Sequence, residues 1–197
     1  MAVAARVSLE EFLAMPETKP HRELIDGVVI RKSAANDNHG ALVAELIAEL
    51  TIYLRRTREA VVRTEVRHLG RAEGRVYLPD VSVTVRGRAA TDRGVRARGP
   101  IEVTPDFAIE VLSPDDPAGR VLERADFYMR SGVRLLWVVD PDTEAVTVYR
   151  PGAPQELHRV PASLDASPVL SEFRLDLASL FAVLHDGGAD APGVAPA

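Results

Sequence analysis

Two acidic residues stand in apolar stretches that otherwise predict buried β-strands. Asp80 follows Pro79 at the start of "VSVTV", and Glu110 lies inside "FAIEVL". A buried carboxylate without a partner costs several kcal/mol, so each acid needs a cation or hydrogen-bond donors nearby. If the two strands are neighbours, about 4.8 Å apart, both side chains can converge on one point. Converging carboxylates repel one another unless they share a proton or bind a cation.

Such a pair favours a Mg²⁺ or Mn²⁺ site, since these ions take one or two carboxylates and complete their coordination with water and substrate phosphate. The spacing alone also fits a simpler interpretation, in which Asp80 caps a turn and Glu110 pairs with an arginine. Arginine is abundant in this chain, because only Lys19 and Lys32 among its 24 basic residues are lysine. Both interpretations are open at this point.

The composition limits the possible functions. The chain has 197 residues, 46% hydrophobic and 27% charged, which is typical of one globular domain. We place this domain at residues 1–185 and expect a disordered tail at 186–197, which is rich in Gly, Ala and Pro. The absence of cysteine excludes disulfides, zinc–thiolate sites and cysteine nucleophiles. No stretch has the pattern of a signal peptide or a membrane span, so we expect a cytoplasmic protein without membrane contact.

The net charge of −5 lacks the basic excess that many nucleic-acid-binding proteins show. Contact with nucleic acid therefore requires a local basic patch. The stretch 86–100, "RGRAATDRGVRARGP", is a candidate, since it is rich in arginine and glycine and predicts a mobile loop. Its arginines could contact phosphates in the manner of a flap.

Alternating helices and strands are expected to position the two acids. Ser8 and Glu11 have the spacing of a capping box, Asp26-Gly27 is a strong hairpin signal, and Gly132 is typical of a helix end. The hydrophobic patterns predict helices at 8–16, 39–56, 118–132 and 175–184, and strands at 22–32 (a hairpin), 60–69, 76–85, 106–112, 133–140 and 145–160 (a hairpin). In the strand at 76–85, the acid Asp80 shares one face with Ser82 and Thr84.

Several motifs resemble the Uma-two (Uma2) family, restriction-endonuclease-like proteins within the PD-(D/E)xK nuclease superfamily. They are "PD" at 79–80, "EVLSP" at 110–114, "YMRSGV" at 128–133 and "LLWVVDP" at 135–141, with "LEEFLAMPE", "RELIDGVVI" and "VLSEFRLDLASLF" near the two ends. The resemblance covers about residues 8 to 182. It implies an α/β fold, a restriction-endonuclease-like mixed β-sheet flanked by α-helices, with an N-terminal helix and β-hairpin.

The resemblance also implies a function, the Mg²⁺- or Mn²⁺-dependent hydrolysis of phosphodiester bonds in DNA. Asp80 and Glu110 match the two acids of the family, so both are expected to be catalytic residues and metal ligands. The superfamily usually carries a lysine two residues past the second acid, where this chain has Leu112. Proteins similar to this one carry it four residues before the tyrosine of the following helix, and counting back from Tyr128 gives Arg124.

Arg124 is thus the third expected catalytic residue, and it departs from the family pattern. A lysine can orient or deprotonate the attacking water, whereas arginine stays protonated. Arginine can still neutralise charge that develops on a phosphate. Two hypotheses remain open: Arg124 supplies the electrostatic part of catalysis, or the site is impaired. Helical spacing places Arg124 on one face with Arg120 and Tyr128, so it can point toward the two acids.

Other candidates complete the expected site. Glu23 could hold a metal-bound water or position Arg124, or it could be a solvated strand residue. His39 could contact phosphate or shuttle protons, or it could cap the long helix. The expected nucleic-acid-binding residues of the flap are Arg93, Arg96 and Arg98.

Three functions therefore compete. The first is a metal-dependent endonuclease that acts on DNA. The second is a catalytically impaired module that binds nucleic acid or serves in assembly, and the third is a metal-dependent hydrolase of a small phosphate ester. A homodimer is expected for the first, because many nucleases of this superfamily need two sites to cut two strands.

Overall fold

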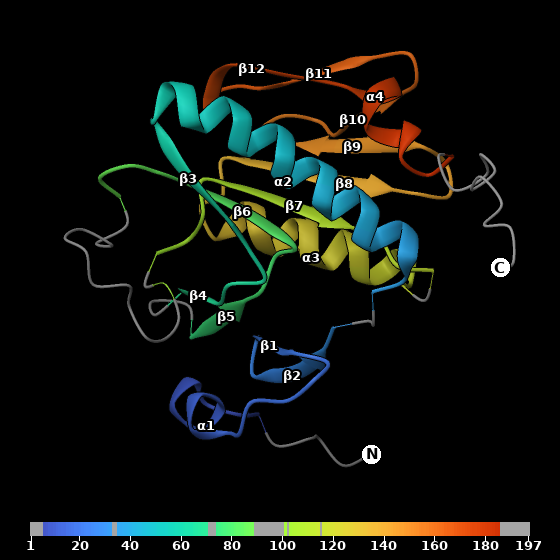
Figure 1. Ribbon diagram of the computed structural model, residues 1–197. Coiled ribbons are helices and arrows are strands. Elements are labelled where there is room, and N and C mark those ends of the chain that lie inside the picture. Colours follow the sequence, from blue (N-terminus) through green and yellow to red (C-terminus); the bar gives the residue numbers. More distant parts are fainter. Residues whose placement is uncertain are drawn as a thin grey trace, which may run out of the picture.

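The computed structural model describes residues 6–32, 35–70, 74–88, 101, 103–114 and 116–185 (Figure 1). The expected flap residues Arg93, Arg96 and Arg98 and the expected disordered tail lie outside these ranges. Within the described ranges, no helix combines the length and the apolar character that a membrane crossing requires.

A six-stranded sheet forms the centre of the fold, in the order β10-β9-β8-β7-β6-β3 (Figure 1). Its strands are β3 (Ala60–Thr64), β6 (Val81–Val85), β7 (Phe107–Val111), β8 (Leu135–Asp140), β9 (Ala145–Tyr149) and β10 (Glu156–Arg159). β7 and β8 are parallel and all other neighbours are antiparallel. The parallel pair needs a crossover, and helix α3 (Ala118–Arg130) supplies it. The predicted mixed α/β sheet is therefore confirmed.

The two faces of this sheet are covered by different elements. On one face lies the largest apolar cluster, built from helix α2 (Asp37–Thr57), helix α4 (Leu177–Ala182) and alternate residues of the strands, such as Phe107, Ile109 and Trp137. On the other face, α3 packs Ala125, Phe127 and Tyr128 against the sheet. Since side chains alternate along a strand, Ala108 and Glu110 of β7 point to the α3 face.

The N-terminal residues form a smaller unit beside the central sheet. Helix α1 (Leu9–Ala14) begins at Ser8 with the predicted capping box to Glu11. The predicted hairpin at Asp26-Gly27 joins β1 (Arg22–Ile25) to β2 (Val28–Arg31), and both turn residues have positive φ, as a type I′ turn requires. These strands belong to a four-stranded sheet, β2-β1-β5-β4, with β5 (Arg75–Tyr77) and β4 (His68–Gly70).

Two strand predictions were wrong in extent. The stretch 76–85 is not one strand, because β5 ends at Tyr77, β6 begins at Val81, and the two belong to different sheets. Pro79 lies in the break, where its missing N–H cannot continue a ladder. The stretch 60–69 is likewise divided into β3 and β4 near Glu65, whose φ is +47°.

One strand pair was not predicted. β11 (Ser163–Ala166) and β12 (Leu170–Asp176) form a two-stranded sheet beside α4, and their buried residues join the cluster on the α2 face. Strand β12 occupies the start of the stretch that was expected to be helical, so α4 begins only at Leu177, after its cap Asp176. The helix at 118–132 and the other predicted strands and hairpins are present.

Candidate functional site

Asp80 and Glu110 face one another between the ends of two neighbouring strands. Val81 of β6 pairs with Ile109 of β7, so the next position outward sets Asp80 opposite Glu110. The backbone N–H of Val111 donates to Oδ2 of Asp80 at 2.8 Å, which fixes this carboxylate against β7. Both acids are only 3% exposed. The structure thus brings together the two acids that the sequence singled out.

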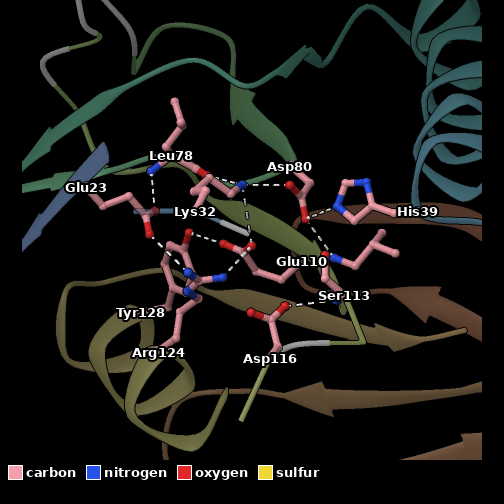
Figure 2. A network of polar contacts seen from close by, with 11 residues as sticks. Glu23, Lys32, His39, Leu78, Asp80, Glu110, Ser113, Asp116, Arg124 and Tyr128 are labelled. Atoms are coloured by element: carbon pink, nitrogen blue, oxygen red, sulfur yellow. Dashed lines mark hydrogen bonds and ion pairs between the residues drawn. The ribbon is translucent and has the colours of Figure 1, made fainter. Parts of the chain in front are cut away.

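The Asp80 carboxylate has two cationic or polar neighbours besides Val111. Nζ of Lys32 lies 2.6 Å from Oδ1, and Nε2 of His39 lies 3.2 Å from Oδ2 (Figure 2). Burial opposes the ionisation of Asp80, but the charge of Lys32 and the contact with His39 outweigh it and hold its pKa below the ordinary value. Asp80 is therefore a carboxylate, able to bind a cation.

The Glu110 carboxylate is held from α3. The hydroxyl of Tyr128 donates to Oε1 at 2.5 Å, and NH1 of Arg124 donates to Oε2 at 3.2 Å (Figure 2). Nζ of Lys32 lies 3.9 Å from the same Oε2 atom. Burial raises the pKa of Glu110 to about 7, although Arg124 and Lys32 lower it. Its neighbours on α3 are one helical turn apart, as the predicted shared face requires.

Arg124 joins Glu110 to a third buried acid, Glu23 of β1. Its NH2 atom lies 3.1 Å from Oε2 of Glu23, and the other oxygen of Glu23 accepts from the N–H of Leu78 at 2.8 Å. The carboxylates of Glu110 and Glu23 raise the pKa of Arg124, so the guanidinium stays charged. Glu23 is 2% exposed, so the solvated-strand hypothesis for it was wrong and its contact with Arg124 is present.

Lys32 is the residue that sequence reasoning missed. It follows β2, its backbone N–H donates to the carbonyl of His21, and its Nζ donates to the carbonyl of Leu78 at 2.7 Å. Burial opposes its charge, but the carboxylates of Glu110, Asp80 and Glu23 more than offset this and raise its pKa. The amino-acid composition could have drawn attention to Lys32, because the chain uses arginine at almost every basic position and has only two lysines.

His39 contacts the site from the first turn of α2, but it does not cap that helix. The helix begins at Asp37, and the side chain of Asn36 accepts the N–H of His39 at 2.9 Å as its cap. The capping hypothesis for His39 was therefore wrong. Arg120, which was expected on the same helical face as Arg124, is exposed on α3.

The charge of the site suits a hard divalent cation, but the number of protein ligands is small. A positive charge, the Lys32 ammonium, already lies between Asp80 and Glu110, and two carboxylates with water and phosphate suit Mg²⁺. Among the described residues, however, no group of three or more His, Cys, Asp or Glu is arranged to hold a metal ion. A cation here would therefore need oxygen ligands from outside the protein.

Comparison with known proteins agrees with the fold. The crystal structure of "a putative nuclease belonging to DUF820" from Anabaena variabilis superposes with a TM-score of 0.80 and is 30% identical, covering 90% of this chain and 99% of that chain. No curated protein matches the chain significantly. The model of the Uma2 family, described as "Putative restriction endonuclease", matches residues 9–178. The likeness in fold and the motifs around Asp80 and Glu110 have one explanation: the chain belongs to the Uma2 family of restriction-endonuclease-like proteins.

Proposed function

We propose that this protein is a metal-dependent nuclease that hydrolyses phosphodiester bonds of DNA at the Asp80–Glu110 pair. The observation that carries the proposal is the cation-holding geometry of two buried carboxylates on neighbouring strands, with a positive charge 2.6 Å from one and 3.9 Å from the other. The family and the nuclease with the similar structure support the same class of reaction. Perturbed acids that converge at a pocket are typical of functional sites.

Asp80 and Glu110 are the residues that would hold Mg²⁺ or Mn²⁺. When bound, such an ion supplies Lewis-acid activation of water and of the phosphoryl group. The protein supplies orientation: Val111 and His39 fix the carboxylate of Asp80, and Tyr128 fixes that of Glu110. Ligands locked in this way lose little entropy when a cation binds.

Arg124 has an electrostatic role in this proposal. Its guanidinium stays protonated, so it cannot accept a proton from water. It holds Glu110 and Glu23 in one arrangement, and its positive charge beside Glu110 can neutralise charge that develops on a substrate phosphate. Glu23 acts through Arg124 as a positioning residue.

A second function, a non-catalytic module that binds nucleic acid, is favoured by one observation. The three buried acids, Glu23, Asp80 and Glu110, are already paired with two cations of the chain itself, Lys32 and Arg124. A site whose charge is largely compensated gains less from a metal. This module would keep the fold and the nucleic-acid contacts and lack turnover.

Plasmid cleavage separates the two functions. Wild-type protein is incubated with supercoiled plasmid in Mg²⁺, in Mn²⁺ and in EDTA, beside Asp80→Ala and the control Asp142→Ala, which changes an exposed acid in the turn after β8. We expect cleavage by the wild type and the control only, and only with metal. Nicked product indicates one site acting alone, and linear product indicates the paired action that a homodimer would give. Binding of the plasmid without metal-dependent cleavage would support the non-catalytic module instead.

The proposal assigns DNA binding to Arg93, Arg96 and Arg98. Replacing all three by alanine should weaken DNA binding and lower the slope of log affinity against log salt, by up to about 0.9 for each phosphate that the variant no longer neutralises. Fluorescence anisotropy at several salt concentrations measures both quantities. An unchanged slope in the triple variant would remove this segment from the DNA-binding surface.

A further inference from the structure

Lys32 has a position that none of the sequence motifs indicated. Its ammonium lies between the two carboxylates that would bind a metal, 2.6 Å from Oδ1 of Asp80 and 3.9 Å from Oε2 of Glu110 (Figure 2). The carbonyl of Leu78 accepts a hydrogen bond from the same ammonium at 2.7 Å. The ammonium is hydrogen-bonded to two of these oxygens and lies near the third, so it holds a positive charge between the two acids where a metal ion would bind.

The backbone delivers this ammonium from a defined direction. β2 is paired with β1, and the pairing continues past its end, where the N–H of Lys32 donates to the carbonyl of His21 at 3.0 Å. Only 11% of the side chain of Lys32 is exposed, so its charge is withdrawn from water. Such burial is favourable only because the carboxylates compensate the charge.

From this geometry we infer that Lys32 is a tethered cation that occupies the metal position and must be displaced before a divalent ion can bind. The inference rests on the proposed metal site. It makes Lys32 a regulator of metal loading, because the ammonium and the metal compete for the same oxygens. The wild-type site is thereby kept stable without metal and binds metal weakly.

A pocket beside Lys32 could accept the displaced ammonium. It is lined in part by Lys19, His21, Lys32, His39 and the two acids Glu65 and Asp80. Its two lysines and two histidines outnumber its two acids, so the pocket can accept a phosphate group. A nucleic-acid phosphate there would attract the ammonium away from Asp80, and metal and nucleic acid would bind more tightly together than either does alone.

Calorimetric titration of Mn²⁺ into the purified full-length protein without nucleic acid tests the inference. Lys32→Met removes the charge and keeps an unbranched side chain that is one atom shorter, and Lys32→Gln of the same length also carries a hydrogen-bond donor. We expect both variants to bind Mn²⁺ on the order of tenfold or more tightly than wild type, since a unit charge a few ångströms from the ion is removed. Mn²⁺ should also raise their melting temperatures more than that of wild type.

Two controls locate the effect. Arg31→Met removes the neighbouring cation, an exposed residue at the end of β2 outside the pocket, and should leave Mn²⁺ affinity at the wild-type value. Adding Asp80→Asn to Lys32→Met should abolish the gain. Equal Mn²⁺ affinity in wild type and both Lys32 variants would overturn the inference, and it would leave the proposed nuclease standing if wild type cuts plasmid. Tighter binding by the variants without any cleavage would sustain the inference and refute the nuclease, and no binding by any protein would refute both.

Discussion

Asp80 and Ser82 lie two residues apart, just before and within β6, and their side chains point to the same face of the sheet. Their polar partners differ: Ser82 has a neutral partner and Asp80 has charged ones. Ser82 contacts His68 of β4, whose Nε2 atom is 2.9 Å from the serine hydroxyl and whose Nδ1 atom is 2.8 Å from the carbonyl of Val103. Burial and the nearby charge of Arg63 lower the pKa of His68 to about 4, so the ring is neutral at pH 7. Asp80 instead lies among charged side chains, with Lys32 and Glu110 beside it.

The difference separates a polar site satisfied within the protein from the site that we propose to be functional. In the His68 region each ring nitrogen has one partner from the protein, so nothing further is needed from a ligand. In the Asp80 region the carboxylate oxygens lie beside the ammonium of Lys32, which a divalent cation could replace. Burying such a cluster stabilises a fold less than an apolar core does, which is a reason to expect a function for it.

The largest contrast should be in cleavage. Glu110→Gln keeps the shape of the side chain and removes its charge, so we expect metal-dependent plasmid cleavage to fall by on the order of 100-fold or more. His68→Gln changes the neutral region and should leave the cleavage rate within a few-fold of wild type, measured on protein shown to be folded by circular dichroism. A comparable loss in both variants would mean that the two regions do not differ in function.

Stability should show the next largest effect. Arg124→Ala leaves Glu23 and Glu110 without their shared partner, so we expect it to lower the free energy of unfolding by on the order of 3 kcal/mol. Arg124→Lys should recover only part of this, because one ammonium cannot donate to both acids as the guanidinium fork does. Urea denaturation measures each value. Arg120→Ala, an exposed change one turn earlier on α3, is the matched control and should cost less than about 0.5 kcal/mol.

The pH dependence of stability should identify the neutral region. The folded-state pKa of His68, about 4, is below its ordinary value of 6.5, so the folded protein disfavours the protonated ring. Its contribution to stability is complete above pH 6.5 and is lost as the pH falls through 4, by on the order of 3 kcal/mol. Urea denaturation of wild type and His68→Gln at about pH 7 and about pH 4.5 measures this, and the variant should lose less stability on acidification. Parallel losses would show that His68 does not titrate as its burial requires.

The smallest expected effect concerns single hydroxyls on the same strand. Ser82→Ala leaves Nε2 of His68 without its partner and should cost roughly 1–2 kcal/mol. The hydroxyl of Thr84 is buried and has no hydrogen-bond partner in the described part of the chain, so Thr84→Val should be neutral or slightly stabilising. Thermal denaturation of the two variants makes the comparison. A larger cost for Thr84→Val would show that contact with His68 is not what Ser82 contributes.

Local patterns in the sequence were sufficient to predict several helix ends, one turn and the two acids of the site. The capping box at Ser8, the turn at Asp26-Gly27 and the helix end at Gly132 are set by residues close together in the chain, and all three are present. Asp80 and Glu110 could be singled out because a charge in an apolar strand needs a partner wherever the strand lies. Arg124 was identified by the resemblance to the family, and helical spacing then placed it on the same face of its helix as Tyr128.

Other features depended on contacts between distant segments. Pro79 signalled a break that the alternation of 76–85 concealed, and only the assembled fold shows β5 and β6 in different sheets. The partner of Asp80 was undetermined as well, since Lys32 is 48 positions away along the chain. The sequence determined that two buried acids needed positive charge. The tertiary structure decided that Lys32 supplies it to Asp80, because electrostatic pairing depends on distance in space, and the packing of the β1–β2 hairpin against the central sheet sets that distance.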